Sequence, residues 1–164
     1  MSLCYFAYGS NMNPARMKAR GLLFSNAESA RLLGYRLVFN KRSHCTPGVA
    51  YANVVHSSLS VVEGVLYTLE DHRALNVMDG FEGTPVRYSR ECMLLHTASA
   101  PKSAWIYVAN PAFVEDDLLP ESNYLAHLMA GAQYLSPEYL AMLHAQPCRP
   151  SVVTLGDSGL LYNA

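Results

Sequence analysis

The eight residues YFAYGSNM, Tyr5–Met12, place a short apolar run directly before a glycine and two small polar residues. The apolar run predicts a short strand, Gly9-Ser10-Asn11 stops it, and Asn13-Pro14 is typical of a helix start. A tight turn from a strand into a helix leaves backbone N–H groups without acceptors, which suits an anion or an oxygen that becomes negative during a reaction. The alternative is structural: the glycine permits a positive φ, and the serine or asparagine caps the helix. This stretch alone does not decide between them.

Beyond this turn, the predicted strands are grouped in the centre of the chain, and the predicted helices lie at intervals and at its end. Alternating or β-branched runs predict strands at 30–40, 52–56, 61–69, 88–96 and 104–108. Helical spacing, with proline or acidic residues near several of the starts, predicts helices at 14–20, 70–79, 122–133 and 137–145. The serine-rich stretch 57–60 predicts a turn, and 80–85 predicts a bend. Because the strands are grouped in the centre, we expect a single α+β domain over residues 1–164 with a curved sheet that can close on itself.

Composition narrows the class of protein. The 164 residues are 51% hydrophobic, which is enough to bury a core without metal or disulfide staples. The net charge is -1 without runs of like charge, which speaks against nucleic acid or an acidic membrane surface as partner. Four scattered cysteines without a CxxC spacing predict free thiols in a reducing compartment. Since neither a signal peptide nor a run of about 18 apolar residues is found, we expect a cytoplasmic protein that does not enter a membrane.

Glu82 is the carboxylate that a purely structural interpretation explains least well. It lies between Phe81 and Gly83, directly after a predicted apolar helix and within a bend bounded by glycines. An aromatic neighbour disfavours the charged form and raises the pKa of a carboxyl group, as a general acid or base needs. The alternative is an ordinary turn glutamate, and Asp79 is a second carboxylate that could cap the turn or orient Glu82.

Other residues with reactive side chains give weaker patterns. Cys45 with His44 or His56 is the only nucleophile and base pair that is close in sequence, and the six histidines form neither HxH nor HxxxH. We therefore expect no metal and no cofactor. Tyrosine combines an apolar ring with a polar tip, as a pocket for a small polar ligand requires, although each tyrosine could equally pack in the core. Four tyrosines lie in predicted elements next to the candidate stretches: Tyr8, Tyr88, Tyr107 and Tyr124.

Further blocks follow the first stretch in a fixed order. They are VxGVLY within 61–69, LNVMDGFEG at 75–83, Tyr88, Tyr107, and Tyr124 with GA and LSPEY after it. Together with YFAYGSNM they resemble the γ-glutamylcyclotransferase-like family. The combination of the YGSN turn with the later EG pair carries the resemblance. A related group that begins with a YGTL-like turn is a poorer match, because Ser10-Asn11 replaces threonine and leucine.

The resemblance implies a small mixed β-barrel-like sheet surrounded by helices, with the glycine turn and the glutamate facing each other across one pocket. It implies that Glu82 is the general acid/base. It further implies that the turn binds the substrate through Gly9, Ser10, Asn11 and Met12. The tyrosines that line the family's pocket correspond to Tyr88, Tyr107 and Tyr124, and Tyr8 adjoins the turn.

The implied reaction is cyclisation of a γ-glutamyl amino acid or amine to 5-oxoproline. The α-amine attacks the γ-carbonyl within one molecule, so the pocket need only hold the attack geometry and move a proton, without a protein nucleophile, metal or cofactor. The expected partner is thus a small γ-glutamyl compound. A non-catalytic small-molecule binding or stress-response module with the same pocket is the alternative. The leaving group stays open, as does a homodimer, because no coiled coil or exposed apolar helix indicates the oligomeric state.

Overall fold

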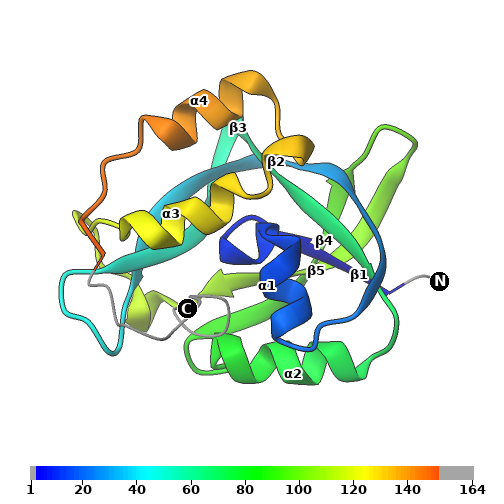
Figure 1. The fold of residues 1–164 in the computed structure, drawn as a ribbon, viewed down its shortest axis with the longest axis horizontal. Helices are drawn as coiled ribbons and strands as arrows, with labels where there is room; N and C mark the ends of the chain where they lie inside the picture. Colours follow the sequence, from blue (N-terminus) through cyan, green and yellow to red (C-terminus); the bar gives the residue numbers. More distant parts are fainter. Residues whose placement is uncertain (1–2, 152–164) are drawn as a thin grey trace.

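A closed five-stranded barrel forms the centre of the molecule (Figure 1). The computed structural model describes residues 3–151. The strands are β1 (Cys4–Ala7), β2 (Phe24–Arg42), β3 (Ala50–Leu69), β4 (Tyr88–His96) and β5 (Pro101–Ala109). Their order around the barrel is β1-β3-β2-β4-β5, and every pair is antiparallel except β1 with β5, which closes the barrel. The predicted α+β class with a mixed, barrel-like sheet is confirmed.

Helices surround this barrel, as predicted. In the view of Figure 1, α4 lies at the top, α2 lies at the bottom, and α3 and α1 lie between them. The α-helices are α1 (Pro14–Ala19), α2 (Arg73–Glu82), α3 (Ser122–Met129) and α4 (Pro137–His144). Three short 3-10 helices complete the described elements: η1 (Ser10–Met12), η2 (Pro111–Phe113) and η3 (Ala132–Tyr134).

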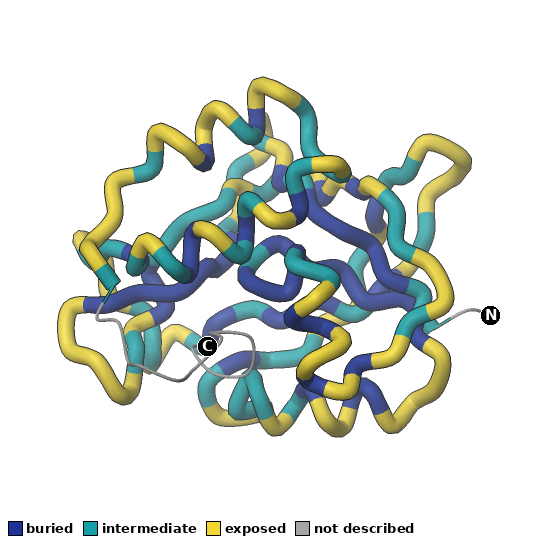
Figure 2. The backbone as a smooth tube through the Cα atoms, viewed as in Figure 1, coloured by how far each residue is buried: buried dark blue, intermediate teal, exposed yellow. Residues whose placement is uncertain are grey.

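The first strand is buried along its whole length. All four residues of β1 are buried, because β3 pairs with it on one side and β5 on the other. Figure 2 shows buried backbone along β1, the turn after it and much of β3, while the outer faces of the helices are exposed. The polypeptide therefore enters the turn of YFAYGSNM directly from the core, which holds that turn in a fixed place.

Two predictions about β3 and α2 are wrong. The turn at 57–60 does not interrupt the strand, since β3 runs through it; instead the ladder with β2 shifts register, from Tyr35 opposite His56 to Leu33 opposite Val61. Gly34, with φ of +78°, lies in β2 at this shift and leaves the four residues 57–60 without partners in β2. The bend predicted at 80–85 begins only at Gly83, because α2 continues to Glu82.

Candidate active site

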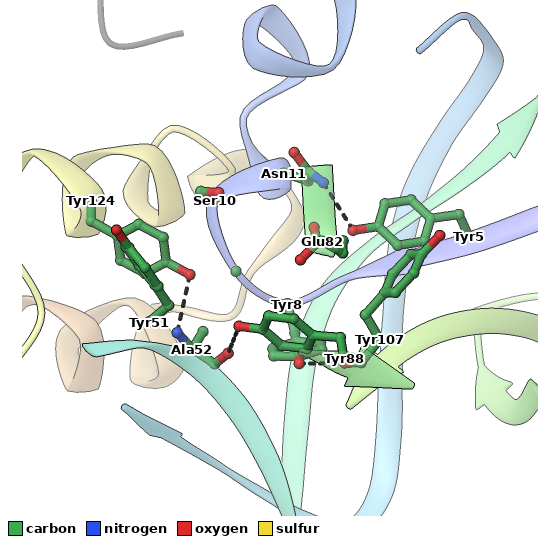
Figure 3. A pocket seen from close by; sticks show the side chains of 11 residues that line it. Tyr5, Tyr8, Ser10, Asn11, Tyr51, Ala52, Glu82, Tyr88, Tyr107 and Tyr124 are labelled. Atoms are coloured by element: carbon green, nitrogen blue, oxygen red, sulfur yellow. Dashed lines mark hydrogen bonds between the residues drawn. The ribbon is translucent and has the colours of Figure 1, made fainter. Parts of the chain in front are cut away.

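A pocket lies between the turn after β1, the end of α2 and the start of β3 (Figure 3). Its cavity volume is about 30 Å³, and the empty space rises to about 360 Å³ when the region open to solvent at its mouth is included. Most of its wall is aromatic, with one carboxylate and the polar turn. The lining residues are Tyr5, Tyr8, Gly9, Ser10, Asn11, Tyr51, Ala52, Glu82, Tyr88, Tyr107 and Tyr124. The structure thus brings together the turn, the glutamate and all four tyrosines that the sequence singles out.

The turn presents backbone N–H groups to this pocket. After Gly9 the chain forms the single turn η1, whose first N–H groups have no intrahelical acceptor. No acceptor within residues 3–151 receives a hydrogen bond from the backbone N–H of Gly9, Ser10 or Asn11. Three successive donors therefore remain available to a ligand at the pocket wall.

Gly9 is required by close packing and not by a positive φ. Its φ is -114°, so the structural alternative of a left-handed glycine is wrong. A Cβ atom at this position would lie 3.0 Å from the hydroxyl oxygen of Tyr124 and 3.3 Å from the Cβ of Ala52. The backbone N–H of Ala52 donates to that same hydroxyl at 3.0 Å. The absence of a side chain thus lets the turn approach the first residues of β3.

A chain of side chains holds the far end of the turn. Arg20 donates to the side-chain oxygen of Asn11 at 3.0 Å, and the Asn11 amide donates to the hydroxyl of Tyr5 at 3.1 Å. The hydroxyl of Tyr67 donates to the backbone carbonyl of Asn11 at 2.9 Å. Asn11 is therefore fixed by three partners, and it does not cap α1, because Asn13 accepts from the N–H of Ala15 instead.

Glu82 is the last residue of α2 and faces the pocket (Figure 3). The helix ends here because Gly83 adopts the left-handed conformation, with φ of 66° and ψ of 36°. The N–H groups of Gly83 and Thr84 both bond to the carbonyl of Asp79, which closes the helix end. Within residues 3–151 the Glu82 carboxylate makes no hydrogen bond or ion pair. It is thus positioned by the backbone and left free for a ligand.

The pKa of the Glu82 carboxyl is raised above its ordinary value. Burial among the pocket walls is the main cause, and the positive charges of Arg20, Lys41 and Arg16 oppose it. The aromatic wall comes from tyrosines. Phe81, the aromatic neighbour expected from the sequence, does not line the pocket and instead packs on the guanidinium of Arg20, 4.5 Å from the ring centroid.

Asp79 lies outside the pocket lining and holds one of its walls. Its carboxylate accepts from the hydroxyl of Tyr107 at 2.7 Å and forms an ion pair with Arg90 at 2.8 Å. The backbone carbonyl of Tyr107 in turn accepts from the hydroxyl of Tyr8 at 2.5 Å. The Asp79 carboxylate therefore fixes Tyr107, and among residues 3–151 it forms no hydrogen bond with Glu82; only the backbone carbonyl of Asp79 helps to close the helix end beside Glu82.

The pocket tyrosines satisfy both interpretations that the sequence left open. They are buried and their hydroxyls have partners, as core residues would; Tyr88, for example, donates to the carbonyl of Ala52 at 3.1 Å. They also line the pocket. Burial raises the pKa of Tyr8 and of Tyr88 well above the usual value, so these hydroxyls keep their protons at neutral pH. This leaves Glu82, the only carboxylate of the lining, as the lining side chain best suited to exchange a proton.

One residue that was predicted to bind the substrate does not line the pocket, and three residues that were not predicted do line it. Met12 does not line it; its side chain is fully buried, and its Cβ lies 2.9 Å from the position that a Cβ on Gly131 would take. The added residues are Tyr5, Tyr51 and Ala52. Tyr5 belongs to the same YFAYGSNM stretch, so the sequence carried a signal for it. No local pattern marks the other two, because the fold brings the start of β3 to the turn.

Lys41 is a buried cation beside the pocket. It is 1% exposed, and its Nζ lies 5.1 Å from the ring centroid of Tyr51 and 5.2 Å from that of Tyr88. Within residues 3–151 its ammonium group makes no hydrogen bond or ion pair. Burial, followed by the charge of Arg87, lowers the pKa of Lys41 to about 8, and Glu82 acts in the opposite direction.

We expect replacement of Lys41 by methionine to raise the free energy of unfolding at pH 7 by about 1–3 kcal/mol, because an apolar side chain of similar volume removes an unfavourable buried charge. The folded pKa of about 8 lies below the reference value of 10.5, so the wild-type protein gains stability as pH rises between these values. The advantage of the variant therefore shrinks above pH 8. Urea denaturation of both proteins at pH 7 and 9.5 measures this; a variant that is less stable at both would contradict it.

The pair of Cys45 and His44 lies outside the pocket. The two side chains are in contact, with Sγ 3.1 Å from Nε2, and Arg87 bonds to the other ring nitrogen of His44 at 3.0 Å. Neither residue lines the pocket, and all four cysteines are free thiols, as predicted. Residues 3–151 contain no cluster of three or more potential metal ligands, and no helix among them is long and apolar enough to span a membrane.

Comparison with known proteins agrees with this geometry. The family model described as "Gamma-glutamyl cyclotransferase, AIG2-like" matches residues 5–126, which include the turn, Glu82 and all of the pocket tyrosines. A search of curated proteins gives no significant match.

Solved structures share the fold at low sequence identity. One titled "Gamma-glutamyl cyclotransferase" superposes with a TM-score of 0.80 and 23% identity, over 97% of this chain and 96% of that one. An uncharacterized protein from Homo sapiens gives a TM-score of 0.80 and 24% identity, over 96% and 95%. A yeast γ-glutamyl cyclotransferase specific to glutathione gives 0.63 and 15%, over 87% and 94%. On the extent of the family match, the chain belongs to the γ-glutamyl cyclotransferase, AIG2-like family.

Proposed function

We propose that the protein is a γ-glutamylcyclotransferase that converts a γ-glutamyl amino acid or amine to 5-oxoproline, with Glu82 as general acid/base and the whole chain acting as one such domain. The observation that carries the proposal is the Glu82 carboxylate, which lines the same pocket as the Gly9–Asn11 turn and has no hydrogen-bond or ion-pair partner among residues 3–151. The names of structurally similar proteins, one of them specific to glutathione, support the same class of reaction.

The position of Glu82 in the pocket supports a role in proton transfer. As a carboxylate it takes a proton from the substrate α-ammonium, which makes the amine nucleophilic. The amine then attacks the γ-carbonyl carbon, the new C–N bond closes a five-membered ring, and the C–N bond to the leaving amine breaks. Glu82 returns the proton to that leaving nitrogen, then takes the second proton that the ring nitrogen must lose to become the lactam N–H and passes it to the released amine. A raised pKa makes the Glu82 carboxylate a stronger base toward the substrate α-ammonium.

The turn supplies electrostatic stabilisation of a negatively charged substrate oxygen. Backbone N–H groups of Gly9, Ser10 and Asn11 donate to a negatively charged oxygen of the substrate, and they need no rearrangement to do so. The buried cations around Glu82 favour the same sign of ligand charge. The tyrosine rings exclude water from the reacting atoms and hold the γ-glutamyl chain in a bent, attack-ready geometry.

Incubation of the purified protein with a panel of γ-glutamyl compounds tests the proposal. The panel contains γ-glutamyl amino acids, γ-glutamyl amines, ε-(γ-glutamyl)-lysine and glutathione, and chromatography measures 5-oxoproline and the released amine. We expect equal amounts of both products from at least one compound. Absence of 5-oxoproline from all of them would refute the proposal. Thermal stabilisation by a compound that is not turned over would instead indicate the binding module.

A further inference from the structure

Arg20 contacts both of the elements that carry the proposed chemistry. It is 4% exposed and directly follows the last residue of α1. Its guanidinium donates to the side-chain oxygen of Asn11, in the turn, at 3.0 Å. The same guanidinium lies over the ring of Phe81, 4.5 Å from the centroid. Since Phe81 immediately precedes Glu82 in α2, one buried side chain contacts the turn that presents the backbone donors and the helix end that presents the carboxylate.

This contact joins two elements that the barrel holds separately. The turn follows β1, which pairs with β3 and β5 in the core. The last turn of α2 is held to β4 and β5 through Asp79, which bonds to Arg90 and Tyr107. In Figure 1, α1 runs from the turn toward α2, and Arg20 at its end meets Phe81. The contact between Arg20 and Phe81 therefore fixes the end of α2 relative to the turn, in addition to the contacts of Asp79.

The guanidinium group is suited to such a link. Its N–H groups donate in the plane of the group while its face packs on an aromatic ring, and the ammonium of lysine lacks both the fork and the face. On the turn, the amide of Asn11 also donates to the hydroxyl of Tyr5 at 3.1 Å, so the side chain that Arg20 holds is fixed at both ends. A displacement of about 1 Å between reacting groups can cost about 10²-fold in rate, so loss of this link should lower kcat.

The charge of Arg20 also acts on Glu82. Among the cations that oppose the effect of burial on the pKa of the Glu82 carboxyl, Arg20 has the largest effect. The others are Lys41 of β2, Arg16 of α1 and Arg87, which precedes β4. Burial raises the pKa of the pocket tyrosines that interact with Glu82, so they stay neutral near pH 7: Tyr5, Tyr8, Tyr88, Tyr107 and Tyr124. Removal of the Arg20 charge therefore raises the pKa of Glu82 further.

We propose that Arg20 is a positioning residue, which joins the turn to the end of α2 and so holds the backbone donors and the Glu82 carboxylate at the separation that ring closure needs. Because Arg20 does not line the pocket, it acts through Asn11 and Phe81 and not on the substrate. The inference rests on the proposed function and adds a residue to the machinery of the same pocket.

Steady-state kinetics of variants on both sides of the contact test the link. The substrate is L-γ-glutamyl-L-alanine or ε-(γ-glutamyl)-L-lysine, whichever the wild-type protein turns over faster. We expect Arg20→Lys and Phe81→Leu each to lower kcat about 10–100-fold with KM within about threefold of wild type. The double variant loses no more than about twofold beyond the larger single loss, because both changes break one link. Lys18→Met is the control, since Lys18 is an exposed cation of α1 outside the pocket lining, and it keeps the wild-type kcat.

Nuclear magnetic resonance of the same proteins gives a readout that needs no turnover. In ¹³C-glutamate-labelled protein the Glu82 signal is the one absent from Glu82→Gln. We expect Glu82 to titrate at higher pH in Arg20→Met than in wild-type protein, and near the wild-type pH in Arg20→Lys, which keeps the charge. The link itself is visible at the turn: Phe81→Leu shifts the amide ¹H–¹⁵N signal of Asn11 in the wild-type background and leaves it in place in the Arg20→Lys background.

Wild-type kcat in both Arg20→Lys and Phe81→Leu, or losses that multiply in the double variant, would overturn the positioning role. Failure of the proposed function looks different, because the wild-type protein then releases 5-oxoproline from neither compound. The resonance measurements decide in that case: an Asn11 signal that does not respond to Phe81→Leu, with an unchanged Glu82 titration in Arg20→Met, would show that Arg20 does not connect the turn with α2.

Discussion

Glu82→Gln lowers kcat for 5-oxoproline release by about 10²–10⁴-fold while the protein stays folded, because the amide keeps the size of the side chain but cannot move a proton. In the wild-type protein the rate rises with pH as the Glu82 carboxyl loses its proton. Its raised pKa places this rise above the usual range of a glutamate. Steady-state kinetics of both proteins over pH 4–8 measure the effect, and the rise is absent from any residual activity of the variant.

Asp79→Asn is the matched control for that variant. Both changes remove one carboxylate from the last turn of α2, but Asp79 bonds to Tyr107 and Arg90 outside the pocket lining. We expect a loss of kcat of about tenfold or less in Asp79→Asn, since it acts only through the position of Tyr107. Equal activity of Glu82→Gln and wild-type protein would show that the proton is moved by another group.

Gly64→Ala destabilises the protein by about 3 kcal/mol, because the added methyl group has no space. Its Cβ would overlap the backbone carbonyl oxygen of Ala7 and lie 2.8 Å from two ring atoms of Phe6. A backbone atom cannot turn aside as a side chain can, so β1 has to shift. That strand leads directly into Tyr8 and the turn, and activity should fall together with stability. Urea denaturation monitored by circular dichroism measures the loss.

Gly80→Ala provides the opposite control. Gly80 lies in α2 on an exposed face, and a Cβ there would meet no atom within 4 Å. Alanine in a helix is favoured over glycine by about 1 kcal/mol, so this variant should be more stable than the wild type. If both glycine variants changed stability by similar small amounts, the close contact between β3 and β1 would be contradicted.

The sequence predicts those parts of the site whose position depends on nearby residues. The order of apolar strand, glycine and helix start is local, so the turn of YFAYGSNM could be placed before the fold was known. Glu82 could be recognised from its setting and from the resemblance, although the sequence assigned it to a bend. The helix α2 continues through Gly80, where the sequence predicted a bend. It ends at Glu82, because Gly83 adopts the left-handed conformation.

Residues placed by long-range pairing could not be predicted. Tyr51 reaches the pocket because the ladder of β2 with β3 brings the start of β3 to the turn, and the register of that ladder shifts at Gly34 and again between Phe39 and Lys41. Met12 shows the converse. It belongs to the local motif, but η1 turns its side chain into the core, so motif membership alone does not place a side chain in a pocket.

The tyrosines show why burial and function need not be alternatives. Tyr124 fixes the start of β3 through the N–H of Ala52 and also forms a wall of the pocket next to Gly9. A hydroxyl that is fully used in such a bond keeps the wall rigid and contributes no proton. Glu82, the single carboxylate of the pocket lining, is then the group that the proposed acid and base chemistry uses.

Turnover of L-γ-glutamyl-L-alanine in H₂¹⁸O, followed by mass spectrometry of all products, tests the central claim most directly. Intramolecular attack by the α-amine adds no water, so the account predicts 5-oxoproline and alanine in equal amounts, both without ¹⁸O. Attack by water on the γ-carbonyl would instead give glutamate that carries ¹⁸O. Labelled glutamate as the main product, or recovery of the intact dipeptide, would contradict the account.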